Sequence, residues 1–428
     1  MNVLIIGSGG REHAIAHKVK QSSLLQKLYY LPTGNAGMVA ISEPVDIKQN
    51  NFDAIINFIE EKNISFVIVG PEQPLADGIV NFLNKKNIPV FGPTKETAML
   101  ECSKSFAKDF MKKYNIPTAS YKVFFRKQKA DVIDLLKHAS FPLVIKADGL
   151  AAGKGVVIPM SFEEAKQTIE DFFDHNIFGD SADKIVIEEF LTGEEASVFA
   201  ISDGENFVLL PSAQDHKRIF DNDEGKNTGG MGAYSPTPVI TGTILNEIKE
   251  NIIIPTIKGM KQENKPFVGC LYCGLIITDK GAKVIEFNCR FGDPETQAVL
   301  PLIESDFLEL LYSASTAGLK NYQLSISNKT AVCVILASRG YPDKYETDKS
   351  INGLTDIDYE TLVFHAGTKN KDGSIVTSGG RVLGVTVLCD SLHEAINKVY
   401  SEVQKIYFDG MYYRKDIGKK GLKYYKGK

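Results

Sequence analysis

Residues 146–157 read Lys-Ala-Asp-Gly-Leu-Ala-Ala-Gly-Lys-Gly-Val-Val, and this segment separates two classes of nucleotide-binding fold. It is similar to a Walker A loop, but only three residues separate Gly149 from Gly153, and Gly155 stands where Ser or Thr should hold magnesium. A strand, and not a helix, is predicted to follow at Val156 to Ile158. The pattern favours a flexible loop between antiparallel strands, whose backbone N–H groups and two lysines could neutralise a triphosphate. A Gly-rich surface hairpin is an equally good interpretation of this segment alone.

The first hundred residues, in contrast, alternate short apolar runs with helical patterns. Such alternation predicts a parallel, doubly wound sheet of the Rossmann-like kind. The expected strands are Val3 to Ile6, Phe66 to Val69 and Ile88 to Phe91, and the expected helices are Phe52 to Lys62 and Leu75 to Lys85. An amphipathic helix over Lys104 to Tyr114 then opens a new region.

Beyond that helix the pattern is of the α+β type. It contains a helix opened by Ser161 with Glu164, a long polar segment from Asp215 to Pro238, and a hairpin of Val268 to Thr278 with Val284 to Arg290. Strands at Ala331 to Ala337, Leu362 to Phe364 and Val382 to Leu388, with a helix capped by Ser391, end the chain. We therefore expect a multidomain α/β and α+β protein with domains at 1–103, 104–328 and 329–428, the second carrying a flap subdomain at about 122–192 and the third being small and β-rich.

Composition and charge exclude several classes of protein. The 428 residues are 43% hydrophobic and 24% charged, as in folded globular proteins, and the net charge of -4 offers no general attraction to nucleic acid or anionic membranes. The longest apolar run, Ala331 to Ala337, is far shorter than the ~18 residues of a membrane span, and no basic leader precedes Val3. We expect a cytoplasmic location. Cys270 and Cys273 lack a second ligand pair, so core packing is favoured over a metal or redox role.

The N-terminal turn, Gly7-Ser-Gly-Gly-Arg-Glu12, follows a strand and opens a helix. Its N–H groups and the helix dipole could bind an anion, most naturally a phosphate. A dinucleotide fingerprint would place a third glycine at Glu12 and an acid at the end of the next strand, where Leu28 to Leu31 stands instead. NAD-type binding is therefore disfavoured, whereas a tight turn without a ligand remains open.

The strongest local signal is Val284-Ile-Glu-Phe-Asn-Cys-Arg290. Strand alternation predicts that Ile285, Phe287 and Cys289 share one face, and that Glu286, Asn288 and Arg290 share the other. Oxygen ligands from Glu286 and Asn288 suit Mg²⁺ bridged to phosphates. Arg290 could hold a carboxylate or a developing acyl phosphate. A strand with a merely polar outer face is the alternative.

Two further segments are less specific. Ile185 to Leu191 is predicted as a strand that turns and returns as Glu195 to Ile201, and its exit could face adenine and the ribose hydroxyls. A plain β-meander is the alternative. His216, in a polar loop, is expected to be solvated and not catalytic.

Together these segments resemble one family, the glycinamide ribonucleotide synthetases, also called phosphoribosylamine-glycine ligases, of the ATP-grasp superfamily. The resemblance runs from the first residue to about Gly418. Seven motifs in the family's order carry it: Gly7 to His13, Gly70-Pro-Glu72, Lys146 to Gly155, Gln214-Asp-His-Lys-Arg218, Asn227-Thr-Gly-Gly-Met-Gly-Ala-Tyr234, Glu286 to Gln297, and Gly379-Gly-Arg-Val-Leu383.

The resemblance implies a role for many of these residues. ATP would be the co-substrate, with Mg²⁺ or Mn²⁺ held by Glu286 and Asn288. The implied nucleotide contacts are Lys104, Lys146, Gly153, Lys154 and Gly155 for the phosphates, Glu188, Glu189, Phe190 and Leu191 for adenine, and Glu195 for ribose. The implied phosphoribosylamine site is Gly9, Gly10, Arg11 and Glu12 with Gly70, Pro71 and Glu72, and the candidates around glycine and the acyl phosphate are Asp215, Lys217, Arg290 and Asp293.

The activity that the resemblance implies is a two-step ligation. Glycine would attack the γ-phosphate of ATP, and the amine of 5-phosphoribosylamine would then displace phosphate from glycyl phosphate. We expect a monomer whose partners are these small molecules, with no nucleic acid and no membrane. The alternatives are a nicotinamide-dependent dehydrogenase, a biotin carboxylase-like enzyme of the same fold that uses bicarbonate, and a nucleotide-binding module without catalysis.

Overall fold

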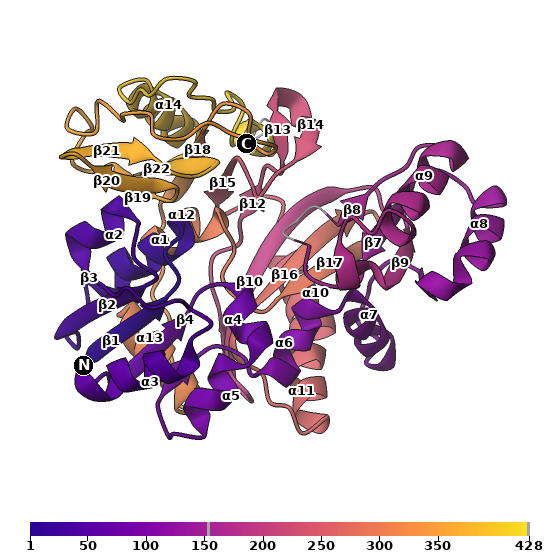
Figure 1. The fold of residues 1–428 in the computed structure, drawn as a ribbon, viewed down its shortest axis with the longest axis horizontal. Helices are drawn as coiled ribbons and strands as arrows, with labels where there is room; N and C mark the ends of the chain where they lie inside the picture. The colour runs from indigo at the N-terminus through magenta and orange to yellow at the C-terminus, as the bar shows by residue number, and fades with distance from the viewer. Residues whose placement is uncertain (152–154, 426–428) are drawn as a thin grey trace.

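The computed structural model describes residues 1–151 and 155–425, and its N-terminal part is built on a parallel sheet (Figure 1). Five strands are arranged in the order β3-β2-β1-β4-β5, and every neighbouring pair is parallel. The predicted doubly wound sheet is therefore confirmed. Its strands are β1 (Asn2–Ile6), β2 (Lys27–Leu31), β3 (Glu43–Pro44), β4 (Phe66–Val69) and β5 (Val90–Phe91).

The helices of this part agree with the sequence pattern except at one position. The single helix predicted over Leu75 to Lys85 is wrong, because Gly78 adopts a left-handed conformation with φ 92° and ends one helix before the next begins. The helices are α1 (Gly10–Val19), α2 (Ala36–Ile41), α3 (Phe52–Glu61), α4 (Glu72–Asp77), α5 (Ile79–Asn84) and α6 (Lys95–Cys102).

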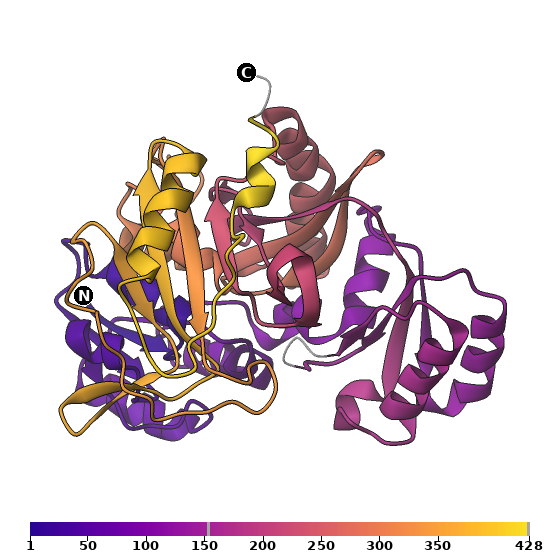
Figure 2. The same ribbon diagram turned by 90° about the horizontal axis from the view of Figure 1, so that it is seen from above.

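A separate lobe contains the segment that resembles a Walker A loop. Its four-stranded sheet has the order β6-β9-β7-β8, and β7 pairs with β8 in antiparallel fashion, Lys146 opposite Val156. The prediction of an antiparallel hairpin is confirmed. Figure 2 shows this lobe projecting from the body of the molecule. Its elements are β6 (Tyr121–Phe125), α8 (Lys129–Lys137), β7 (Leu143–Ala147), β8 (Val156–Val157), α9 (Phe162–Phe173) and β9 (Lys184–Glu189), preceded by α7 (Lys104–Lys113).

The central sheet has the order β11-β10-β16-β17 and includes the predicted hairpin of β16 and β17. The predicted return pair is wrong, however: β9 and β10 follow each other in the chain but belong to different sheets. β10 pairs with β16 along its whole length, from Glu194 opposite Ile277 to Asp203 opposite Val268, while β9 lies between β6 and β7. The elements are β10 (Glu194–Asp203), β11 (Phe207–Leu209), α10 (Gly242–Ile248), α11 (Ile254–Gln262), β16 (Val268–Thr278) and β17 (Gly281–Asn288).

The C-terminal sheet, in the order β12-β15-β18-β22-β19, includes strands from the long polar segment. That segment was expected as a loop, but it contains β12 (Gln214–Asp215), β13 (Arg218–Phe220), β14 (Glu224–Asn227) and β15 (Gly232–Ser235). The remaining elements are α12 (Glu295–Val299), α13 (Phe307–Ser315), β18 (Thr330–Ala337), β19 (Leu362–His365), β20 (Thr368–Lys371), β21 (Ser374–Thr377), β22 (Arg381–Cys389), α14 (Leu392–Val403) and α15 (Lys419–Leu422).

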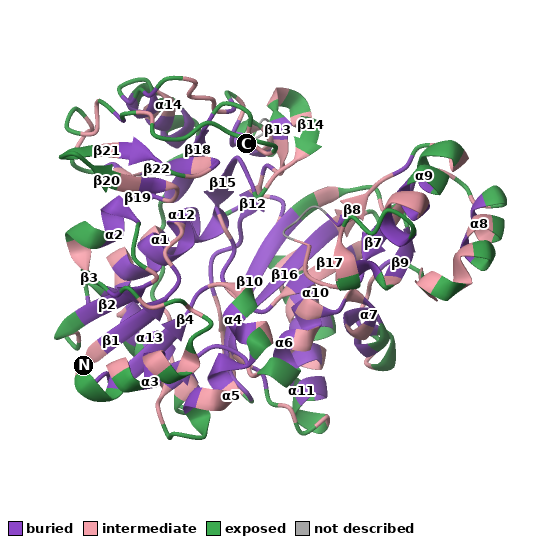
Figure 3. Ribbon diagram, in the orientation of Figure 1, coloured by how far each residue is buried: buried purple, intermediate pink, exposed green. Residues whose placement is uncertain are grey.

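The strands of the N-terminal and central sheets are largely buried (Figure 3), and residues of both sheets pack in one hydrophobic cluster. The β16 strand carries Cys270 and Cys273, which are both buried, and each packs in a different hydrophobic cluster. The prediction that these cysteines serve core packing is therefore confirmed. Within the described ranges, no helix has the length and apolar character to cross a membrane.

A pair of histidines lies where the N-terminal and C-terminal parts meet. The backbone N–H of His365, on β19, donates to Nδ1 of His13, on α1, at 2.8 Å. Burial, followed by the charges of His365 and His17, lowers the pKa of His13 to about 3. Burial also lowers the pKa of His365 to about 4. Both rings are therefore neutral in the folded protein at pH 6, although they would be largely protonated in an unfolded chain below pH ~6.5.

We expect this pair to make the protein less stable in mild acid. Because the unfolded chain binds more protons than the folded one, the free energy of unfolding should fall as the pH is lowered from about 6.5 toward 4. His13→Asn, whose amide oxygen can accept the same hydrogen bond, should reduce that slope by up to about 1.4 kcal/mol per pH unit. Urea unfolding between pH 4.5 and 8 measures this, with exposed His393→Gln as control; an unchanged slope in His13→Asn would contradict the assignment.

Candidate functional site

The strand that was predicted to carry the metal ligands contains a β-bulge. Gly274 pairs with Glu286 and Leu275 pairs with Val284, so Ile285 is an extra residue on β17. The bulge shifts the alternation by one position. Val284 is fully buried in the core with Phe287 and Cys289, whereas Ile285 lines a small cavity. The predicted face of Ile285 is therefore wrong, and the faces of Phe287 and Cys289 are as predicted.

Lysines approach this strand from the lobe that contains β7 and from α7. Nζ of Lys146 lies 2.9 Å from Oε1 of Glu188 and donates to the carbonyl oxygen of Ile285 at 3.1 Å. Lys104 donates to the carbonyl of Gly149 at 3.0 Å. Burial lowers the pKa of Lys104, and the nearby carboxylate of Glu286 partly offsets this effect. Gly155 is buried, while Gly153 and Lys154 lie outside the described residues.

The four residues that were assigned to adenine, at the end of β9, have different environments. Glu188 is buried between two lysines, because its Oε2 also lies 2.9 Å from Nζ of Lys108. Glu189 accepts a hydrogen bond from the backbone N–H of Ser120 at 2.9 Å. Phe190 is 42% exposed and Leu191 is half-buried. The side chain of Glu188 is thus engaged in ion pairs, so the backbone and the two apolar side chains are what this exit presents.

Lys217 connects the ribose candidate with the metal candidate. Its Nζ lies 3.1 Å from Oε2 of Glu195 and 4.0 Å from Oε1 of Glu286. Glu195 raises the pKa of Lys217 well above its usual value, against the effect of burial and with the support of Glu286. The structure therefore brings together three residues that are separated by long stretches of chain.

Next to Lys217 lies a buried group of polar side chains that the sequence analysis missed. Tyr272 and Ser197 both donate to Oε1 of Glu295, at 2.9 Å and 3.1 Å. Burial, and then the charge of Glu295, raise the pKa of Asp215 well above its usual value. Glu295 lies in the motif from Glu286 to Gln297, but Tyr272 and Ser197 lie in predicted strands without any further signal. Two carboxyl groups in one buried place favour either a shared proton or a bound cation.

Arg290 lies at the centre of a second charged cluster. It contacts Oε1 of Glu101 at 3.0 Å and Oε2 of Glu72 at 3.4 Å, and it donates to Oδ1 of Asn288 at 3.4 Å. Burial would raise the pKa of Glu72, but Arg290 and then Arg11 hold it below its usual value. Glu101, which also accepts the N–H of Cys289 at 2.7 Å, was not found from the sequence.

The N-terminal turn lies beside the Arg290 cluster. The side chain of Glu12, which belongs to this turn, occupies part of the space within the turn. The carboxylate of Glu12 accepts the N–H of Gly9 at 2.7 Å and a hydrogen bond from Arg11 at 2.6 Å. A Cβ atom at Gly70 would lie 2.2 Å from Oε1 of Glu12, so a larger residue there would displace this carboxylate. Pro71 packs against the same turn, next to Gly7. The structure thus brings both halves of the predicted phosphoribosylamine site together, while Glu12 already takes one backbone donor of the predicted anion site.

Asp293 is held by an arginine from the C-terminal sheet. Arg381, at the start of β22, lies 3.0 Å from Oδ2 of Asp293 and donates to its carbonyl at 2.9 Å and to that of Gly229 at 2.6 Å. The Gly379 to Leu383 motif contained Arg381 but did not indicate its contact with Asp293.

His216 was expected to be solvated, and this expectation is wrong. Its side chain is 1% exposed and points inward beside Tyr234. Burial lowers the pKa of His216 to about 4.

Family models match most of the chain in three successive parts. They are the N domain of phosphoribosylglycinamide synthetase over residues 1–101, its ATP-grasp (A) domain over residues 102–296 and its C domain over residues 331–420. The chain belongs to the phosphoribosylglycinamide synthetase family. The three domains follow one another in the order in which the sequence motifs occur along the chain.

Relatives within the phosphoribosylglycinamide synthetase family are similar over their full length. The chain is 49% identical to a phosphoribosylamine–glycine ligase of Caldanaerobacter subterraneus subsp. tengcongensis, covering 97% of this chain and 99% of that protein. It is 49% identical to the ligase of Chlorobaculum tepidum, covering 99% and 100%. The crystal structure of the Thermotoga maritima ligase covers 97% of this chain and 100% of its own, with 37% identity and a TM-score of 0.83.

A more distant likeness concerns the fold alone. A biotin carboxylase from Campylobacter jejuni shares 15% identity and a TM-score of 0.74, covering 97% of this chain and 94% of that structure. Two of the three alternatives are therefore disfavoured: the dehydrogenase by family membership, and the biotin carboxylase-like enzyme by the much higher identity to the synthetase family.

Proposed function

We propose that this chain joins glycine to 5-phosphoribosylamine, consuming ATP and forming glycinamide ribonucleotide, ADP and phosphate through glycyl phosphate. As a member of its family, the chain is an ATP-dependent ligase of purine biosynthesis. One observation supports the site above all others. Burial would raise the pKa of Glu286, but four cations from separate parts of the fold hold it below its usual value: Lys217, Lys146, Lys104 and Arg290.

Such a convergence suits a reaction that transfers a highly charged phosphoryl group. Lys104 and Lys146 are proposed to neutralise the phosphates of ATP, together with the loop containing Gly153, Lys154 and Gly155. The adenine ring is proposed to lie against Glu188 to Leu191, and the ribose hydroxyls against Glu195. The exposed Phe190 supports this assignment, because an aromatic face left uncovered at a strand exit can pack against a base.

The donor set fits a hard divalent cation. Within the described residues, no group of three or more His, Cys, Asp or Glu side chains could hold a metal ion by itself. Glu286 and Asn288 supply one carboxylate and one amide oxygen, and Mg²⁺ typically takes its other ligands from phosphates and water. We propose that these two residues hold Mg²⁺ or Mn²⁺, which would neutralise charge on the phosphates when bound.

The clusters around Arg290 and Asp215 suit an amino acid substrate. Arg290 is proposed to hold the glycine carboxylate and the acyl phosphate, since a guanidinium binds either in bidentate fashion. The paired carboxyl groups of Asp215 and Glu295 fit an ammonium group, which relieves their mutual repulsion. Lys217 and Asp293, the latter oriented by Arg381, complete this part of the site.

The remaining substrate is proposed to bind at the N-terminal turn. Gly9 to Glu12 and Gly70 to Glu72 face each other there, at the start of α1, where the helix dipole favours a phosphate. An acyl phosphate is hydrolysed by water, so the segment between β7 and β8 is proposed to cover the nucleotide during turnover.

We further propose that the chain has domains at 1–103, 104–328 and 329–428, that it is a monomer, and that it is located in the cytoplasm.

Isotope transfer tests the proposed chemistry. Glycine labelled with ¹⁸O in its carboxylate should transfer one labelled oxygen to the released phosphate, which mass spectrometry detects. Phosphate release should require ATP, the divalent ion, glycine and freshly generated phosphoribosylamine, each omitted in turn. Unlabelled phosphate throughout, or ATP cleavage that responds to bicarbonate and biotin in place of glycine, would refute the proposal.

A further inference from the structure

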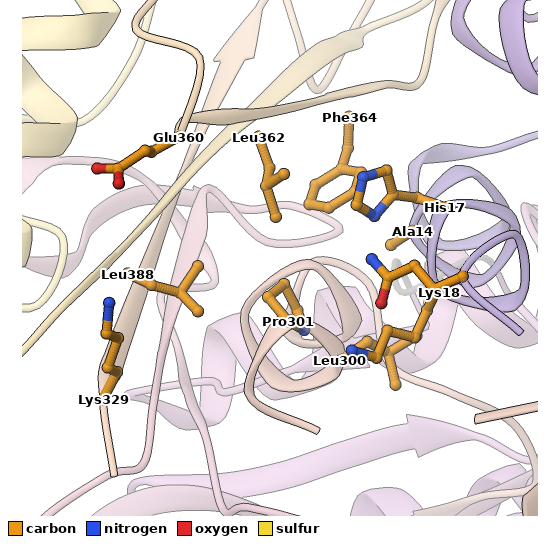
Figure 4. A pocket seen from close by; sticks show the side chains of 11 residues that line it. Ala14, His17, Lys18, Leu300, Pro301, Lys329, Glu360, Leu362, Phe364 and Leu388 are labelled. Carbon is orange, nitrogen blue, oxygen red and sulfur yellow. The ribbon is translucent and has the colours of Figure 1, made fainter. Parts of the chain in front are cut away.

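A cavity of about 260 Å³ lies between α1, the turn that follows α12, and the C-terminal sheet (Figure 4). The wall from α1 consists of Ala14, His17 and Lys18, which follow one another at helical spacing and therefore share one face of the helix. Leu300 and Pro301 form another wall, and the C-terminal part supplies a third. Segments that are far apart in sequence thus enclose this space.

The cavity is separate from the site described above. None of the residues that we place in the nucleotide, metal, glycine or phosphoribosylamine sites lines it. The N-terminal turn of α1 faces Glu72 and Arg290, whereas the cavity begins at Ala14 and continues along the second half of the helix. A ligand bound here would therefore not compete with the substrates for the same atoms.

One side of the cavity is apolar and partly aromatic. Phe364 is 2% exposed and lies edge-on to the ring of His17, with 5.9 Å between the ring centroids. Leu362 and Leu388 extend the same surface, as Figure 4 shows. Burial, followed by the charges of Lys18 and Lys20, lowers the pKa of His17, so its ring is neutral near pH 7. These side chains offer an organic ligand contact area but no charge.

The charge comes from two lysines. Across the part of the chain that the structure describes, neither Lys18 nor Lys329 has a carboxylate within the 4.0 Å of an ion pair. Glu304 and Asp306 act on Lys18 from a greater distance, and burial still lowers its pKa. The one acid on the cavity wall, Glu360, is already paired with Lys398 at 3.1 Å. Lys18 is half-buried, and a half-buried ammonium group without an ion-pair partner is costly unless an anion joins it, whereas Lys329 is exposed.

We propose that this cavity binds a small organic anion with an apolar or aromatic body. The body would lie against Phe364, Leu362 and Leu300, and its carboxylate or phosphate would bind Lys18, with Lys329 at the other end of the cavity. A water molecule takes about 30 Å³ of liquid volume. The cavity therefore has room for about nine water-sized groups, which matches a ligand smaller than a nucleotide, and its volume lies just below the usual range for ligand pockets.

Two probe pairs test the proposal on the full-length protein. Phenyl phosphate and benzoate carry the proposed anion, while benzyl alcohol and benzylamine have similar bodies that are neutral or cationic. Saturation-transfer NMR with titration should show that at least one anion binds at least tenfold more tightly than both controls. Comparison of phenyl phosphate with benzoate then distinguishes a phosphate ligand from a carboxylate ligand.

Variants locate the bound probe. Lys18→Gln should weaken binding of the anion about tenfold, whereas Lys20→Gln, at the exposed residue directly after the end of α1, should not. Saturating ATP with Mg²⁺ should leave probe binding unchanged, and Lys18→Gln should retain phosphate release. Equal binding of all four probes, displacement by ATP, or equal effects of the two lysine variants would overturn the proposal without bearing on the proposed ligase activity.

Discussion

Glu286→Gln is expected to lower kcat for phosphate release by about 10³-fold while the protein remains folded. The substitution keeps the shape of the side chain but removes the one carboxylate around which Lys217, Lys146, Lys104 and Arg290 converge. Without it, the cation that we propose there loses its charged ligand, and the four positive groups lose one of the negative charges near them. Phosphate release at increasing Mg²⁺ or Mn²⁺ concentration, with ATP, glycine and phosphoribosylamine present, measures the effect.

A matched surface variant separates this effect from a general loss of charge. Glu205→Gln removes a carboxylate whose side chain is 68% exposed and which pairs with Lys261 at 2.9 Å, so its kcat should be unchanged. Circular dichroism and thermal unfolding should be the same for both variants. Near-normal turnover of Glu286→Gln, or a loss that occurs equally in Glu205→Gln, would remove Glu286 from the metal site.

Glu188→Leu is expected to reduce the free energy of unfolding by about 3–5 kcal/mol, the usual cost of breaking a buried ion pair from one side. Glu188 is paired with both Lys108 and Lys146, and the three side chains are at most 5% exposed. Burial, partly offset by Glu188, lowers the pKa of Lys108 to about 8. The substitution leaves two buried ammonium groups without a counterion. Urea unfolding followed by fluorescence and by circular dichroism measures the loss.

The double variant Glu188→Leu with Lys108→Met tests the physical reason. It removes one buried cation together with the anion, so it should recover more than half of the stability that Glu188→Leu loses. Glu189→Gln, next to it in the strand but exposed, should change stability by less than about 0.5 kcal/mol. If the double variant is no more stable than Glu188→Leu, the charge of Lys108 is not what the carboxylate compensates.

Features that depend on neighbouring residues were predictable from the chain. The β16–β17 hairpin, the helix that follows Ser103 and the antiparallel pairing of β7 with β8 all agree with the pattern. Local periodicity and turn chemistry specify such elements, because their hydrogen bonds join residues that are close in sequence. The same reasoning predicted that Glu286 and Asn288 lie on one strand, where we propose them as oxygen ligands.

Features that depend on the details of strand pairing and on packing were not predictable from the chain. The bulge at Ile285 arises from the pairing of β17 with β16, and no residue type within β17 marks it. β9 and β10 look like consecutive strands of a meander, but their partners lie in different sheets. His216 looks solvated within its own polar segment and becomes buried because that segment joins the C-terminal sheet through β12 and β15.

The alternation of strands and helices, the hairpins and the types of residue available for chemistry follow from the order of amino acids alone, since period and capping act over a few residues. Which of those residues meet is a property of the folded chain. Glu101 reaches Arg290 across 189 positions of sequence numbering, and Arg381 reaches Asp293 across 88. Contacts of this kind form only when whole sheets and helices pack, because burial and charge pairing depend on distance in space and not along the chain.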